Sequence, residues 1–80
     1  MDRMVTILST NGFRFVIYTN DHDPAHGHAI NADGEAKINL TGAVDLVWVD
    51  GMKRSSVRKV MEIVVEHHAE FLARWEEIHG

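Results

Sequence analysis

The chain has 80 residues, no cysteine, and eight basic against 12 acidic residues, for a formal net charge of −4 at pH 7. This length predicts a single domain over residues 1–80 with one modest core, and the lack of cysteine excludes disulfides and cysteine-based zinc sites. The acidic balance argues against coating of nucleic acid by the whole surface. No stretch approaches the roughly 20 apolar residues of a membrane span, so we expect a cytoplasmic protein without a membrane partner.

The first half of the chain has the pattern of a hairpin followed by a third strand. Residues 5–9 form a short β-branched run, Asn11-Gly12 is a strong turn signal, and residues 13–19 form the clearest strand of the sequence. A loop then contains Pro24, which stops any helix, and an extended pattern resumes over residues 26–31.

The next segments predict two further strands. Asp33-Gly34 marks a turn, after which residues 35–40 alternate polar and apolar, so that Ala36, Ile38 and Leu40 are expected to face a core. Residues 43–49 supply another strand before the Asp50-Gly51 turn. Trp48 in this strand is expected to pack in the core, with an interface anchor as the alternative.

The last third of the chain predicts one long amphipathic helix, straight or bent, from Ser55 or Ser56 to His79. Alternatively, residues 52–56 form a separate turn and the helix starts nearer Val57. Apolar residues recur there at spacings of three and four. Trp75 is expected in the core, His68 as a hydrogen-bonded core or boundary residue, and His67 and His79 on the surface.

Together these elements predict an α+β fold. An antiparallel sheet of about four or five strands carries the long C-terminal helix packed across one face. The pattern shows no linker, internal repeat or low-complexity tract.

Three of the six histidines lie within Asn20-Asp21-His22-Asp23-Pro24-Ala25-His26-Gly27-His28. On a strand, His26 and His28 point to one face with Cα atoms about 6.6 Å apart, a spacing that suits two ligands of one metal. His22 or an aspartate would complete a three-ligand site for a divalent metal such as zinc. The alternative to a functional site is a solvated loop, since Asn, Asp and Pro are ordinary turn formers.

A competing chemistry needs no cofactor. Two histidines can divide general acid and general base duties while Asp21 and Asp23 orient them, as in cleavage of an RNA phosphodiester. Lys37 or Arg54 would then stabilise the charge that develops on the phosphate.

A basic cluster, Lys53, Arg54 and Arg58, lies at the predicted start of the helix. Cations are disfavoured there by the helix dipole, and a bound phosphate would remove the conflict. The cluster is therefore a candidate nucleic-acid-binding site, with a solvated basic turn as the alternative.

From Phe13 through His28, and again at Gly34-Glu35-Ala36-Lys37, the chain resembles a family of small bacterial proteins described as a domain of unknown function. The family pattern is an aromatic strand, Ser-Asn-Asp-His-x-Pro-x-His-x-His, Gly-Glu-Ala-Lys and a terminal helix. Thr19 replaces the usual serine. Carried over by position, the signature residues are Asp21, His22, Pro24, His26, His28, Glu35 and Lys37. Our candidate catalytic residues are Asp21, His22, His26, His28, Glu35 and Lys37.

This resemblance implies the toxin half of a toxin–antitoxin pair, with a small cognate antitoxin as partner. From the residues we add RNA as a candidate target and a metal-independent ribonuclease as the candidate activity. The alternative is a noncatalytic module that binds a metal or a partner protein through the same histidines. The sequence also leaves open whether the chain assembles into a homo-oligomer.

Overall fold

The computed structural model of the chain describes residues 3–80, so the first two residues of the predicted domain lie outside the described part. Five strands are followed by two helices. The strands are β1 (Met4–Thr10), β2 (Phe13–Tyr18), β3 (His26–Ile30), β4 (Glu35–Asn39) and β5 (Asp45–Asp50). The helices are α1 (Arg54–Glu66) and α2 (His68–His79).

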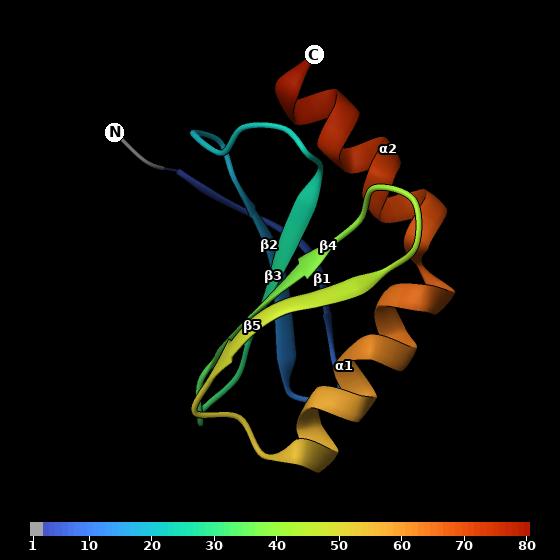
Figure 1. Cartoon of the computed structure of the whole chain (residues 1–80). Coiled ribbons are helices and arrows are strands. Elements are labelled where there is room, and N and C mark those ends of the chain that lie inside the picture. Colours follow the sequence, from blue (N-terminus) through green and yellow to red (C-terminus); the bar gives the residue numbers. More distant parts are fainter. Residues whose placement is uncertain (1–2) are drawn as a thin grey trace.

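The strands form one antiparallel sheet in chain order, β1-β2-β3-β4-β5, and Figure 1 follows this meander from blue to yellow. Each connection is a short turn or loop. The predicted hairpin is confirmed: Asn11 and Gly12 both have positive φ, of 54° and 81°, as a two-residue turn between antiparallel strands requires. The expected α+β class and antiparallel sheet are therefore confirmed.

The single long helix is wrong, because the chain forms two helices that meet at His67. The backbone of this residue has φ −103° and ψ 18°, outside the helical range. No glycine or proline marks the break. At the junction the Nε2–H of His68 donates to the carbonyl oxygen of Leu40, at 2.6 Å, so the predicted hydrogen-bonded role of His68 is confirmed. α1 begins at Arg54, slightly before either predicted start.

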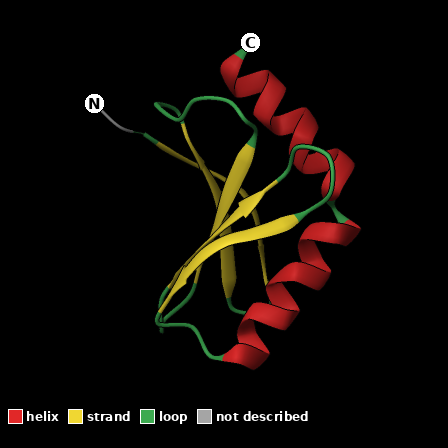
Figure 2. Ribbon diagram, viewed as in Figure 1, coloured by secondary structure: helices red, strands yellow, loops and turns green. Residues whose placement is uncertain are grey.

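Both helices cover the same side of the sheet (Figure 2). Side chains that alternate along β2, β3 and β4 face them, and the rings of Phe15 and Phe71 lie 5.5 Å apart across this layer. The predicted core positions Ala36, Ile38, Leu40 and Trp75 are all buried. None of the helices in the described part of the chain is long and apolar enough to cross a membrane.

Two expectations about exposure fail. Trp48 is 41% exposed, because β5 is an edge strand all of whose residues are exposed. His67 and His79 are half-buried and not fully exposed. The ring of His79 stacks on that of Trp75, with ring centroids 3.7 Å apart, and the ring of His67 stacks on that of Phe71, with centroids 5.8 Å apart.

Candidate functional site

His26 and His28 project from β3 on the side of the sheet away from Ala29, as expected for alternate residues of a strand. Their ring centroids are 5.6 Å apart. In the sheet, His28 pairs with Val16 on β2 and with Lys37 on β4, so it stands at the centre of the three middle strands.

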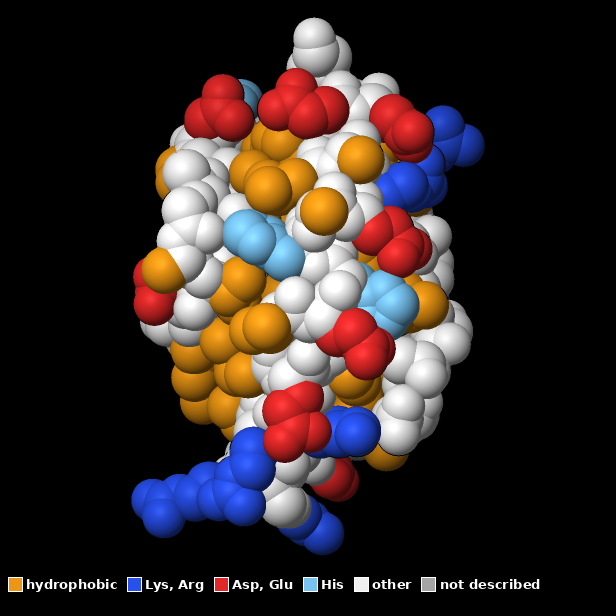
Figure 3. Space-filling view, turned by 90° about the vertical axis from the view of Figure 1, so that its right-hand side faces the viewer, with side chains coloured by type: hydrophobic (Ala, Val, Ile, Leu, Met, Phe, Trp, Pro, Cys, Tyr) orange, Lys and Arg blue, Asp and Glu red, His pale blue; other side chains and the backbone are white. Residues whose placement is uncertain are grey.

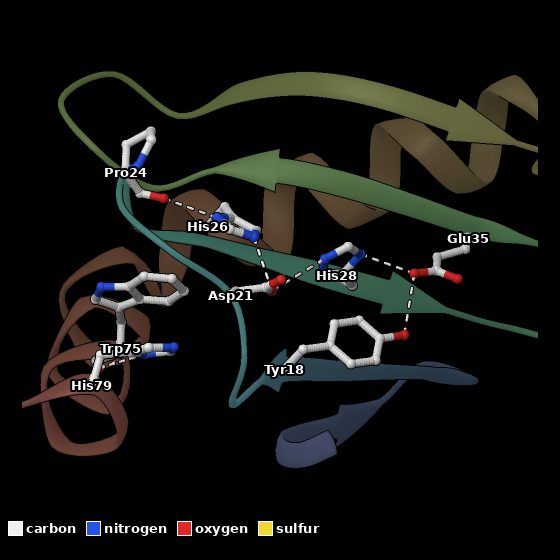
Figure 4. Close-up of polar contacts among 8 residues, drawn as sticks. All are labelled: Tyr18, Asp21, Pro24, His26, His28, Glu35, Trp75 and His79. Atoms are coloured by element: carbon white, nitrogen blue, oxygen red, sulfur yellow. Dashed lines mark hydrogen bonds and ion pairs between the residues drawn. The ribbon is translucent and has the colours of Figure 1, made fainter. Parts of the chain in front are cut away.

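Asp21 joins these histidines from the loop between β2 and β3 (Figure 4). Its amide donates to the carbonyl oxygen of Tyr18, at 3.1 Å, which holds the start of the loop against the end of β2. Its Oδ2 lies 2.9 Å from Nε2 of His26 and 3.7 Å from Nε2 of His28. One carboxylate oxygen therefore stands between the two imidazoles.

The other nitrogen of each ring is turned toward a different acceptor. The Nδ1–H of His26 donates to the carbonyl oxygen of Pro24, at 2.8 Å, because a carbonyl can only accept. Nδ1 of His28 lies 2.8 Å from Oε2 of Glu35, and the hydroxyl of Tyr18 donates to the same oxygen at 3.4 Å. Both Nε2 atoms thus face inward, toward Asp21.

The contacts within the cluster are short but poorly aligned. Oδ2 of Asp21 and Nδ1 of His28 are buried, and neither forms a well-directed hydrogen bond with any group in residues 3–80. Their separations of 2.9 and 2.8 Å from His26 and Glu35 are therefore ion-pair contacts. A buried carboxylate oxygen with unused accepting capacity is costly unless a proton or a cation satisfies it.

Burial sets the electrostatics of this cluster. His26 and His28 are only 6% and 8% exposed. Burial lowers the pKa of His28, against the opposing pull of the Glu35 and Asp21 carboxylates. Burial and the neighbouring Glu35 raise the pKa of Tyr18. Both shifts favour neutral side chains beside the carboxylates.

Aromatic rings wall the cluster. Tyr18 and Trp48 lie edge-on to His28, with ring centroids at 4.7 and 5.8 Å, and Trp75 lies 5.1 Å from His26. The sequence pattern alone does not predict these three residues at the site. Only the pairing of β4 with β5 and the position of α2 bring the two tryptophans there, and neither can be read from local pattern.

The predicted site residues divide into those that the structure brings together and those that it does not. Asp21, His26, His28 and Glu35 form the cluster, and Lys37 lies opposite His28 on β4. His22 is exposed, next to the cluster in sequence but outside it. Three side chains with potential metal-ligand atoms converge within 4.8 Å of one another, namely Asp21, His26 and His28. Of the two predicted ways to complete a three-ligand set, the structure therefore brings the aspartate to the histidines and not His22.

The basic residues Lys53, Arg54 and Arg58 lie elsewhere. All three are exposed at the start of α1, at the end of the molecule opposite the loop between β2 and β3 (Figures 1 and 3). In Figure 3 basic side chains gather at the lower end of the helical face. The structure therefore separates them from the histidine cluster.

The fold and the site together define a small α+β protein with a buried histidine–carboxylate cluster on the sheet face opposite Ala29, where Trp75 of α2 lies against His26. The chain belongs to the family described as Domain of unknown function (DUF4160), which matches residues 12–76. The resemblance to a small family of unknown function is thus confirmed at that level. No curated protein and no solved structure matches the chain.

Proposed function

We propose that this protein is a cytoplasmic toxin of a type II toxin–antitoxin pair and that it cleaves RNA without a metal at the Asp21–His26–His28 cluster. The observation that carries the proposal is the placement of two imidazoles, with different hydrogen-bond surroundings, on either side of one carboxylate oxygen. Such a pair can supply a general acid and a general base to one reaction.

His28 is the general base in this proposal. Its Nδ1 lies against Glu35, so the proton of the neutral ring is on Nδ1 and the lone pair is on Nε2. His26 is the general acid. Its Nδ1–H donates to the carbonyl oxygen of Pro24 and its Nε2 faces the Asp21 carboxylate, so Nε2 is the nitrogen from which the proposed acid gives its proton.

The chemical step follows from these roles. Nε2 of His28 takes the proton of a ribose 2′-hydroxyl, and the resulting oxygen attacks the adjacent phosphorus. The P–O5′ bond breaks as Nε2 of His26 gives its proton to the departing oxygen, leaving a 2′,3′-cyclic phosphate and a 5′-hydroxyl. The phosphate takes the position of the Asp21 carboxylate between the rings, and Lys37 on the neighbouring strand stabilises its negative charge.

The test combines growth with cleavage of RNA by purified protein in the presence of a chelator. We expect His26→Ala and His28→Ala each to lower the cleavage rate by at least about 100-fold and to relieve growth inhibition. The matched control is His22→Ala, an exposed histidine beside the cluster, which should keep both activities. If the folded His26→Ala/His28→Ala protein stays fully toxic, the site assignment fails.

The basic cluster at the start of α1 is proposed to bind the RNA backbone. Neutralising Lys53, Arg54 and Arg58 together should weaken RNA binding about equally for all sequences and reduce its dependence on salt. The rate of cleavage of bound RNA should not change, because these residues lie far from the histidines.

The second candidate function is a noncatalytic module that uses the same cluster to bind a partner, such as the cognate antitoxin. Burial favours it, since imidazoles that are 6% and 8% exposed offer little surface to a polymer. Co-purification of the antitoxin with wild-type protein and its loss with His28→Ala, while RNA stays intact, would support this function. Light scattering of the chain alone and with the antitoxin reports the oligomeric state of each.

A further inference from the structure

We propose that Asp21, His26 and His28 form a binding site for one divalent transition-metal ion of the zinc type, and that a bound ion switches off proton transfer at the cluster. The first half of this inference stands on the geometry of the three side chains alone. The second half, the regulation, rests on the proposed ribonuclease function.

The ligand atoms lie close to the separations that such an ion requires. Bonds of about 2.1 Å to a tetrahedral zinc ion place neighbouring ligand atoms about 3.4 Å apart. Oδ2 of Asp21 lies 2.9 Å from Nε2 of His26 and 3.7 Å from Nε2 of His28, values that bracket this spacing. All three ligand atoms lie within 4.8 Å of one another. Closer approach of the two imidazole rings around Asp21 would complete the site.

The outer contacts orient the rings as metal-binding histidines are usually oriented. A ligating histidine donates its second N–H to a carbonyl or carboxylate, which fixes the tautomer and aims the other nitrogen at the ion. His26 donates from Nδ1 to the carbonyl oxygen of Pro24, and Nδ1 of His28 lies against Glu35. Tyr18 in turn donates to that carboxylate. Both Nε2 atoms are thereby left facing Asp21.

The electrostatics also favour a cation at this point. The buried Oδ2 of Asp21 has no well-directed hydrogen bond within residues 3–80, and an ion would satisfy it. Two imidazoles and one carboxylate suit zinc and neighbouring transition metals, whereas magnesium and calcium prefer oxygen ligands alone. Three protein ligands leave at least one position for water or a small ligand.

Metal binding and the proposed proton transfers use the same atoms. An ion on Nε2 of His28 takes the lone pair that would accept the 2′-hydroxyl proton. On Nε2 of His26 the ion replaces the proton that would pass to the leaving oxygen. The two states therefore exclude each other, and zinc is expected to inhibit RNA cleavage while a chelator restores it.

The decisive experiment is calorimetric titration of untagged, chelator-stripped protein with Zn²⁺, with Co²⁺ absorption as a report on coordination. We expect one ion per chain and a tetrahedral Co²⁺ spectrum. Asp21→Asn, which preserves side-chain size, and His26→Ala should each weaken binding at least tenfold. Two controls should bind as the wild type does: His22→Ala beside the cluster, and His67→Ala, which removes the exposed contacts of His67 with Glu66 and Glu70.

The outcomes separate this inference from the proposed function. Absence of one-to-one binding in the wild type, or binding that survives in folded Asp21→Asn but is lost in His22→Ala or His67→Ala, overturns the metal site. RNA cleavage that requires Zn²⁺ overturns the inference that a bound ion and proton transfer exclude each other. If the stripped protein leaves RNA intact, the proposed ribonuclease fails, whereas the binding isotherm still decides the metal site.

Discussion

The two faces of the sheet are made by alternate residues of the same strands, yet they are filled in different ways. Toward the helices, Phe15, Ala29 and Ile38 are at most 2% exposed and belong to the hydrophobic core. On the other face His28 is nearly as well buried, but among carboxylates and aromatic rings. Burial alone therefore does not identify a hydrophobic core, because one face of this sheet buries apolar side chains and the other buries titratable ones.

The largest expected effect comes from the helix-covered face. Phe15→Ala should lower the free energy of unfolding by about 3–5 kcal/mol, because it removes a buried ring that packs on Phe71. Its neighbour Arg14 points to the other face and is exposed, so Arg14→Ala should change stability by no more than about 0.5 kcal/mol. Urea unfolding measures both, and equal losses would contradict the comparison.

A smaller loss is expected where the helices join the sheet. His68→Ala removes the donor to the carbonyl oxygen of Leu40, a residue with no exposed surface. The loss should be about 1–3 kcal/mol, since the carbonyl is left without its partner. The exposed His22 serves as control, and His22→Ala should leave the unfolding midpoint unchanged. A neutral result for His68→Ala would show that the break between α1 and α2 does not depend on this bond.

On the face that carries the histidine cluster, His28 should make the free energy of unfolding depend on pH. Because burial lowers the pKa of His28, the unfolded chain binds more protons than the folded chain. The contribution of His28 to stability is complete above about pH 6.5 and is lost as the pH falls below this ordinary value, by no more than about 1.4 kcal/mol per pH unit. Unfolding in chelator across this range should show a shallower slope for His28→Gln than for wild type. An unchanged slope of unfolding free energy against pH would contradict a lowered pKa of His28 in the folded chain.

The smallest effect is expected at His67 on the helices, and its dependence on pH has the opposite sign to that of His28. The bond between His67 and Glu70 raises the pKa of His67, so its contribution is present below the ordinary histidine value and is lost as the pH rises through the folded pKa. In Glu70→Gln an NMR titration of His67 should move back toward the ordinary pKa. The titration of His28 in the same spectra is the internal control and should not move.

Much of the fold follows from local pattern. Alternation with period two predicted the strand over residues 35–40, and β-branched or apolar runs predicted the others. The turn residues at Asn11-Gly12, Asp33-Gly34 and Asp50-Gly51 marked three of the connections. The break at His67 could not be predicted, because the apolar spacing runs through it without interruption. The exposure of Trp48 could not be predicted either, since an edge strand and a central strand can share one apolar pattern.

The candidate site, too, is determined partly by local sequence and partly by tertiary structure. That His26 and His28 share a face is a property of any β-strand, and the sequence alone determined it. Whether Asp21 or His22 turns toward them depends on the path of the loop after Tyr18, which only the tertiary structure decided. The same holds for the distance between the basic start of α1 and the histidines. Side-chain alternation is set by the backbone of one residue and its neighbours, whereas convergence at a site is set by the pairing and packing of distant segments.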